Sequence, residues 1–343
     1  MKQNWENHLA AWHLAEAGRW EEALDAAGAC PDLHALLSQR AFRPINTADA
    51  VIIGWQCYYQ GLYREALGHF HSEEMADACD GPGGWRRAWS RLGIAKVASD
   101  SGHWKSALGW CAAAWILAAE EEHLDLLAQI AGARGEILLR AGKPLDAAAA
   151  FAEDRALLPP GSRYHGRVRS YEAHAWARLG PNGRAAATLA YRMALHSPGE
   201  AATAGYAAAG LALLAAREDH TGWNPEEWSV PATGLPQFWL LVVKARACPS
   251  AETLRQAAET LPAIHFAEHW WLANWSRSMG INGPPAPDLR DVFPESIPPP
   301  PQDSRTLVEE PVDPGQIPDA PWWTNKLPQT PDQWWRIRDC FMP

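Results

Sequence analysis

The chain has 343 residues, of which 47% are hydrophobic and 20% are charged, and its formal net charge at pH 7 is −10. This length allows one large domain or two ordinary ones, and the aromatic content excludes wholesale disorder. The acidic balance argues against nucleic-acid binding carried by overall charge, because phosphate contacts need clusters of Lys and Arg.

The sequence predicts a cytoplasmic protein. It contains no run of 18 apolar residues, so no membrane-spanning helix is expected, and its first residues lack the apolar stretch of a secretory signal. The six cysteines are scattered without a CxxC pair, which is typical of reduced thiols. The Ala- and Trp-rich, Lys-poor composition is typical of bacteria with GC-rich genomes.

A short string recurs along the first 200 residues. Each copy reads Gly, any residue, usually an aromatic residue, two further residues and then Ala. Four clear copies begin at Gly18, Gly61, Gly102 and Gly142, and a weaker fifth begins at Asn182. The alanines that anchor the five copies are separated by 43, 41, 40 and 40 residues, and they are Ala23, Ala66, Ala107, Ala147 and Ala187.

Two further positions recur in phase with these alanines, and together they predict a helical hairpin in each copy. Gly or Asn at a helix end can adopt the left-handed conformation that stops the helix, and the aromatic residue two positions later would cover the turn. Small residues let two antiparallel helices approach closely, and a residue four positions after the alanine lies on the same helix face. The small residues lie twelve positions before each alanine, at Ala11, Gly54, Ala95, Gly135 and Ala175. The residues four positions after it are Ala27, Phe70, Cys111, Phe151 and Tyr191.

This pattern resembles the tetratricopeptide repeat over about residues 4–198, although its period is near 40 residues and the family's is 34. The resemblance implies an all-α, right-handed superhelical solenoid of about five to six helical hairpins. We therefore expect a repeat array over residues 1–200.

The repeat pattern decays after residue 200, where we expect a helical continuation and C-terminal cap over residues 201–283. Helices are predicted at 201–217, at 236–247, from Ser250 to near Leu261, and at 263–279. Residues 284–343 form a proline-rich arm, with fourteen prolines between 284 and 331. Extended polyproline-type chain is expected there. Thr330 and Gln333 have the spacing of a capping box, which predicts a short terminal helix.

The resemblance to tetratricopeptide arrays places one set of side chains on a concave, partner-binding groove. This groove would be aromatic at its N-terminal end and charged further along. The alternative is that the tryptophans only pack between consecutive helices. The predicted groove residues are Trp5, His8, Trp12, Trp55, Tyr59, Trp89, Lys96, Asp100, Glu136, Arg140, Arg169, Glu172 and Trp176.

The predicted function is protein–protein interaction, as a scaffold, adaptor or regulatory subunit. Trp, Tyr and Arg dominate interface energetics, and Trp also stacks on proline rings, which favours an extended proline-containing ligand. The proline-rich arm carries two tryptophan pairs, which we expect to be anchors on this chain's own array or on a partner. The tail anchors are Trp322, Trp323, Trp334 and Trp335.

The sequence offers little chemistry. His265 and His269 have the i, i+4 spacing of metal ligands on a helix, but no third ligand is evident, so we expect no metal and no cofactor. No nucleophile elbow, phosphate-binding loop or dinucleotide fingerprint occurs. We expect no enzyme. The alternatives are a carbohydrate-active or metal-dependent enzyme on a helical toroid, and a dedicated chaperone for one client.

Overall fold

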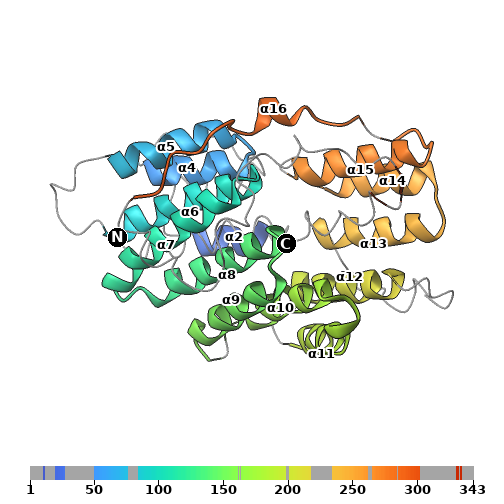
Figure 1. Ribbon diagram of the computed structural model, residues 1–343, viewed down its shortest axis with the longest axis horizontal. Helices are drawn as coiled ribbons and strands as arrows, with labels where there is room; N and C mark the ends of the chain where they lie inside the picture. Colours follow the sequence, from blue (N-terminus) through green and yellow to red (C-terminus); the bar gives the residue numbers. More distant parts are fainter. Residues whose placement is uncertain are drawn as a thin grey trace.

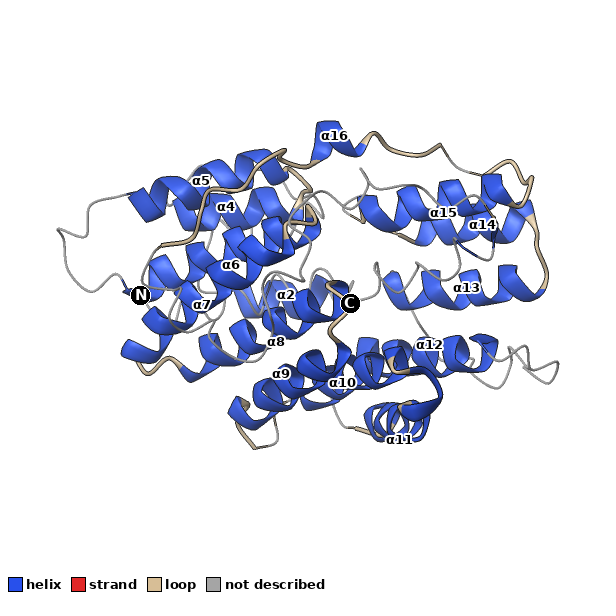
Figure 2. Ribbon diagram, in the orientation of Figure 1, coloured by secondary structure: helices blue, strands red, loops and turns tan. Residues whose placement is uncertain are grey.

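The computed structural model describes residue 11 and residues 20–27, 50–75, 84–160, 162, 164–197, 201–217, 234–261, 265–283, 285–301, 330, 331 and 333. In these residues every regular element is a helix and none is a strand (Figure 2). None of the described helices is long and apolar enough to cross a membrane. The α-helices are α2 (Trp20–Ala27), α4 (Ala50–Tyr59), α5 (Tyr63–Met75), α6 (Gly84–Asp100), α7 (Trp104–Glu120), α8 (Leu124–Arg140), α9 (Pro144–Leu157), α10 (His165–Arg178), α11 (Arg184–Leu195), α12 (Ala201–Arg217), α13 (Leu235–Ala247), α14 (Ala251–Thr260), α15 (Phe266–Ser278) and α16 (Leu289–Val292).

Three of the recurring glycines end the first helix of their hairpin, as predicted, while Gly18 of the first copy lies outside the described residues. Gly61, Gly102 and Gly142 have φ values of 75°, 84° and 76°, a left-handed conformation that glycine adopts without steric cost. The residue after each glycine donates its N–H to a carbonyl five positions back, for example His103 N to Ala98 O at 2.9 Å. This pattern is a Schellman motif, which satisfies the carbonyls at the helix end.

The fifth copy turns differently from the prediction. The left-handed glycine is Gly180, with φ 64°, and a short 3₁₀ turn over Gly180–Asn182 follows it. Gly183 has φ −96° and precedes α11 as its N-cap. The Asn182-Gly183 pair therefore belongs to the start of α11, and the stop signal lies two residues earlier.

The small residues and the alanines form the seam of each hairpin, as predicted. Ala66, Ala107, Ala147 and Ala187 are completely buried, and so are the side chains four positions later. A Cβ atom on Gly54 would lie 2.5 Å from the Phe70 ring, and one on Gly135 would lie 2.6 Å from the Phe151 ring. The aromatic rings therefore fill space that only glycine leaves open. The later side chains are Phe70, Cys111, Phe151 and Tyr191.

The aromatic residue after the turn glycine closes the turn. Trp104 is largely buried, and its indole Nε1–H donates to Ser99 O at 3.1 Å across the turn of Gly102. Tyr63 is buried at the equivalent position after Gly61. The indole thus covers the turn and also satisfies a carbonyl at the end of α6, which the sequence pattern alone did not predict.

Successive hairpins stack into a curved array. The first helices α4, α6, α8, α10 and α12 contact one another in sequence, and α12, α13 and α14 continue the series. In Figure 1 the described helices follow an arc from α4 and α5, through α8 and α9, to α13 and α14. This all-helical arrangement is compatible with an α-solenoid.

The two ends of the arc meet. Phe266 of α15 lies against Gly61, where a Cβ atom would collide with its ring, and its ring centroid is 6.3 Å from that of Tyr63. Phe266 and Trp270 pack against the apolar cluster formed by the first hairpins. The C-terminal helices therefore contact the opposite end of the array.

The predicted C-terminal helices are present. Helices α12 to α15 follow the predicted spans within a few residues, and Ser250 accepts a hydrogen bond from Thr253 N as the N-cap of α14. The capping box is also formed, since Thr330 Oγ1 accepts from Gln333 N at 3.3 Å and Gln333 Oε1 accepts from Thr330 N at 3.2 Å. The run Asn224-Pro225-Glu226-Glu227 also predicts a helix start, from an N-cap residue followed by Pro and two acids, but it lies outside the described residues.

Candidate functional site

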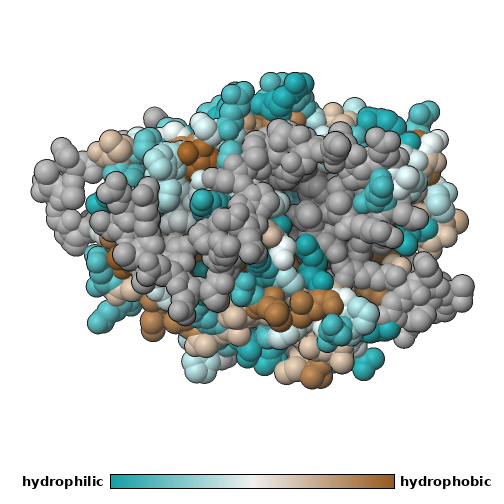
Figure 3. Space-filling view, in the orientation of Figure 1, coloured by the Kyte–Doolittle hydropathy of each residue, from teal (hydrophilic) through white to brown (hydrophobic). Residues whose placement is uncertain are grey.

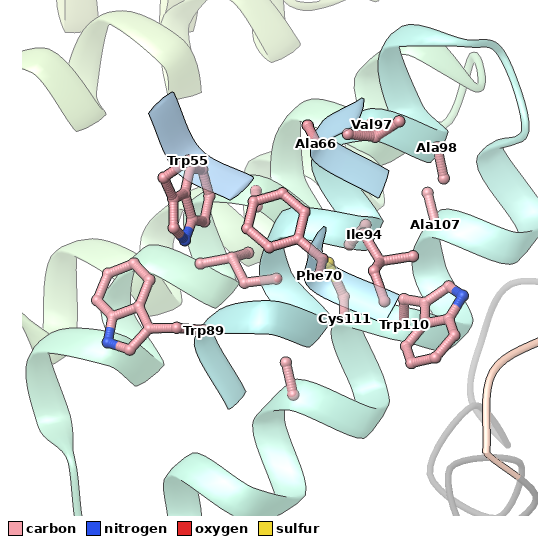
Figure 4. Close-up of a cluster of buried hydrophobic side chains, with 14 of the residues drawn as sticks. Trp55, Ala66, Phe70, Trp89, Ile94, Val97, Ala98, Ala107, Trp110 and Cys111 are labelled. Atoms are coloured by element: carbon pink, nitrogen blue, oxygen red, sulfur yellow. The ribbon is translucent and has the colours of Figure 1, made fainter. Parts of the chain in front are cut away.

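The aromatic half of the predicted groove is buried. Trp55, Tyr59 and Trp89 are 4%, 5% and 3% exposed, and all three belong to the apolar cluster drawn in Figure 4 and its surroundings. The Trp55 ring meets Phe70 and Trp89 edge-on, with centroids 5.3 and 5.9 Å away. These rings leave no face for a partner, so the groove assignment of these three residues is corrected to helix packing. Phe70, the buried ring of the hairpin seam, provides one of the surfaces against which Trp55 packs.

The charged half of the predicted groove forms ion pairs between successive repeats. Lys96 Nζ lies 2.6 Å from Glu136 Oε2, and the Arg140 guanidinium is paired with the Asp100 carboxylate. In each pair the partners are 40 residues apart, which is one repeat. All four side chains lie on α6 and α8, the first helices of their hairpins. They are only partly exposed, so their charges act mainly on one another.

Neighbouring carboxylates keep the two basic groups, Lys96 and Arg140, charged despite their burial. Burial lowers the pKa of Lys96, but Glu136 and Asp100 outweigh it and raise the pKa above its ordinary value. The same balance, led by Asp100, raises the pKa of Arg140. Tyr58 also contacts the Asp100–Arg140 pair, since its hydroxyl donates to Asp100 Oδ2 at 2.8 Å.

The histidine pair lies where α15 meets this charged group. Glu268 is buried, and burial raises the pKa of its carboxyl against the opposing effect of His265 and Arg140. His265 Nδ1 lies 3.7 Å from Glu268 Oε2. Within the described part of the chain no three His, Cys, Asp or Glu side chains come together as metal ligands would. His265 and Glu268 thus lie together at the contact between the ends of the arc.

The remaining predicted groove residues lie on α10. Glu172 is ion-paired with Arg155 of α9 at 3.4 Å, Arg169 is half-buried, and Trp176 packs between two apolar clusters. These residues are not brought into contact with the Lys96–Glu136 pair by any interaction among the described residues.

Asp154 of α9 is a buried carboxyl that the sequence analysis did not single out. It is 7% exposed, and its Oδ2 occupies the space where a Cβ atom on Gly132 would lie, 2.6 Å away. Burial, together with the nearby Glu136, raises the pKa of Asp154 to about 8, and Arg167 opposes this only in part. The carboxyl is therefore mostly protonated at neutral pH.

Part of the proline-rich arm lies on the array. We call residues 293–301 the strap. In Figure 1 the strap leaves α16, runs past α5 and continues toward α6 and α7. At its start, Phe293 is buried with its ring centroid 4.8 Å from that of Tyr63, and Arg64 donates from Nε to Phe293 O at 3.3 Å. Arg64 also donates to Arg290 O.

The proline end of the strap rests on α7. Trp110 donates its indole Nε1–H to Pro298 O at 2.9 Å, and in Figure 4 its indole points out of the cluster toward this segment. A Cβ atom on Gly109 would lie 2.7 Å from Pro300 Cγ. Trp110 is only 1% exposed, so its position is fixed by the core on one side and the strap on the other. We call Tyr63, Arg64, Gly109 and Trp110 the strap-binding surface.

Burial varies along the strap. Phe293 and Pro294 are buried, residues 297, 298, 300 and 301 are partly buried, and Glu295, Ser296 and Pro299 are exposed. The strap therefore rests on the array at both ends and faces solvent at three positions. Ile297 packs against the apolar cluster of the first hairpins.

Several predicted site residues lie outside the described residues. These are Trp5, His8 and Trp12 of the groove, and the tail anchors Trp322, Trp323, Trp334 and Trp335. Their predicted roles stay predictions.

Exposed apolar side chains are spread over several helices. Met75, Leu124, Leu145 and Leu189 are 59–70% exposed and come from α5, α8, α9 and α11. On the face shown in Figure 3, apolar residues gather over α9 and α10. Single exposed apolar side chains are ordinary on a protein surface and carry no functional conclusion.

Comparison of the chain with family models, curated proteins and solved structures found no match. The resemblance to the tetratricopeptide repeat therefore rests on the in-phase positions of the sequence and on the hairpin geometry described above.

Proposed function

We propose that the chain is a protein–protein interaction module, acting as a scaffold, adaptor or regulatory subunit. Its hairpins would form a tetratricopeptide-like superhelical array that binds an extended segment of a partner protein. The aromatic end of the groove in the sequence analysis is not part of this proposal, because Trp55, Tyr59 and Trp89 lie in the core.

One observation carries the proposal: the helical array holds an extended segment by hydrogen bonds to its main chain. Trp110 donates to Pro298 O and Arg64 donates to Phe293 O, two carbonyls that any extended chain presents. Main-chain recognition with a few side-chain pockets is how many proteins bind extended peptides. An array that binds one such segment has the geometry to bind others.

The experiment is reconstitution of a complex from purified components. Affinity capture by the tagged full-length chain identifies candidate partners, and each is then purified and titrated by calorimetry. We expect at least one partner to bind stoichiometrically with a Kd in the micromolar range or below, as is usual for specific complexes. If no candidate forms a complex with the folded chain, the proposal is wrong.

A hydrolase on a closed helical array is the second candidate. It is favoured by the contact between the ends of the arc and by Asp154, whose carboxyl is protonated at neutral pH and has the pKa of a general acid. Turnover of a glycoside or ester substrate that is abolished in Asp154→Asn would favour this candidate over an interaction module.

A further inference from the structure

We infer that the strap-binding surface is a recognition site for proline-rich extended segments, and that the strap is its resident ligand. A partner's proline-rich segment would bind by displacing the strap. This inference rests on the proposed function, since it names the class of partner and how access to the array is controlled.

The hydrogen bonds of the site accept any extended chain, and the residues around the bonded carbonyl favour a proline-rich one. The acceptor of Trp110 is the carbonyl of Pro298, and the next three residues are also prolines. The three prolines that follow have no N–H to donate to this carbonyl, and a run of prolines holds the extended form before it binds. A tryptophan N–H directed at such a carbonyl, beside a slot for a proline ring, is a general solution for binding polyproline segments.

Gly109 supplies that slot. It lies within α7, where glycine is the least favourable residue after proline. The three atoms nearest to a Cβ at this position all belong to Pro300, at 2.7, 3.3 and 3.8 Å. The absence of a side chain at this position therefore matches the place of the proline ring.

The contacts of the strap suit an exchangeable ligand. Its fully buried anchors are Phe293 and Pro294, its proline end is only partly buried, and Glu295, Ser296 and Pro299 face solvent. The stretch that connects it to α15 is exposed at Gly280, Asn282 and Gly283. Covalent attachment gives such a segment a high effective concentration, which occupies the site without requiring a high intrinsic affinity. A partner with a second contact elsewhere on the array can then outcompete it.

The test cuts the covalent connection between the strap and the array and leaves both pieces in the sample. A site for a specific protease is inserted between Pro285 and Ala286 in the full-length chain, and the chain is cut after folding. The probe is a fluorescent peptide with the sequence Asp288 to Pro301, and its binding is followed by anisotropy. We expect the probe to exchange with the cut segment, and to bind the uncut chain at least about tenfold more weakly because the tethered strap competes.

Two substitutions and one control identify the site. Gly109→Leu fills the slot for Pro300, and we expect it to abolish probe binding to the cut chain. Trp110→Phe removes one hydrogen bond and should weaken the probe about three- to tenfold. Gly68→Ala, on an exposed face of α5 with no atom within 4 Å of the new Cβ, should leave the affinity unchanged. A peptide with Pro298 to Pro301 replaced by alanines should not bind.

An uncut variant covers the case in which cutting unfolds the protein. Phe293→Ala with Ile297→Ala weakens the strap while the array stays intact, so this full-length variant should bind the unsubstituted probe more tightly than the parent chain does. The inference is overturned if the probe binds neither the cut chain nor this variant, or if Gly109→Leu binds it normally.

These outcomes are distinct from failure of the proposed function. If the probe fails but a purified partner still binds the chain, the site is wrong and the interaction module stands. If the probe exchanges as expected but no partner forms a complex, the site binds polyproline and the proposed function is wrong.

Discussion

Lys96 on α6 and Glu136 on α8 occupy the same position in two successive repeats, and Nζ of the lysine lies 2.6 Å from Oε2 of the glutamate. Their side chains are 24% and 16% exposed, so neither charge is fully solvated. The contact joins neighbouring hairpins through their first helices, α6 and α8. The pair thus links successive hairpins through a charge pattern with the period of the repeat.

A double-mutant cycle tests this pair. We expect Glu136→Leu alone and Lys96→Met alone each to lower the free energy of unfolding by about 1–3 kcal/mol, because each leaves the other charge partly buried without its partner. The double variant Lys96→Met with Glu136→Leu should recover most of that loss, since well-packed apolar residues can replace such a pair. Urea denaturation provides the free energies. Additive effects of the two single substitutions would show that the residues do not interact.

The hairpin seam gives a prediction with a matched control. Gly54→Ala places a Cβ atom 2.5 Å from the Phe70 ring, and we expect a loss of about 1–3 kcal/mol of stability from overpacking. Gly68→Ala, in the exposed interior of α5, should instead stabilise the chain by about 0.5–1 kcal/mol through helix propensity. Thermal melts of the two variants should therefore shift in opposite directions. A shift in the same direction would contradict the seam assignment.

The sequence predicted the hairpins because their causes are local and repeated. A left-handed glycine, a small residue and a buried ring recur at fixed spacing, and each contributes to the same turn or seam. Gly61, Gly102 and Gly142 confirm this. The fifth copy was placed incorrectly, since Gly180 and Asn182 are equally plausible stops when only residue types are considered.

The site was harder to predict because its contacts are distant in the chain. The Trp110–Pro298 hydrogen bond spans 188 residues, and no local pattern indicates it. Trp55 was assigned to the groove because residues at its position in the repeat point toward the concave face. Its burial, however, depends on Phe70 and Trp89 from neighbouring helices. Lys96 and Glu136 occupy the same position in successive repeats and carry opposite charges, so their pairing could have been predicted from the sequence.

The buried carboxyl of Asp154 predicts an unusual pH dependence. Its pKa is about 8 in the folded chain against an ordinary 3.8, so the folded state binds the proton more tightly than the unfolded state. Its contribution to stability is therefore greatest below pH 4 and is lost as the pH rises toward 8. Each pKa unit corresponds to about 1.4 kcal/mol, so ionisation at high pH costs several kcal/mol.

The measurement is urea denaturation of the parent chain and of Asp154→Asn between pH 5 and pH 9. Asn keeps the shape without the charge, so we expect the variant to gain stability relative to the parent as the pH rises, and to be the more stable chain at pH 9. Asp125→Asn, at an exposed position, is the control for net charge. Parallel curves for the parent and Asp154→Asn would show that this carboxyl is not held in an apolar site.

Closure of the arc can be tested at Phe266. Its ring packs against Gly61 and Tyr63, at the far end of the array from its own helix neighbours α13 and α14. Phe266→Asp would place a carboxylate in this apolar contact, and an unpaired charge there is strongly unfavourable. Separation of the ends would lengthen the molecule without melting its hairpins, because each hairpin has its own seam. We therefore expect small-angle scattering to show a larger maximum dimension while circular dichroism retains the helical signal. Leu145→Asp, at a 59% exposed position on α9, is the control and should leave the scattering profile unchanged. If the Phe266 variant is fully helical and has the scattering profile of the parent chain, the contact does not hold the ends of the arc together.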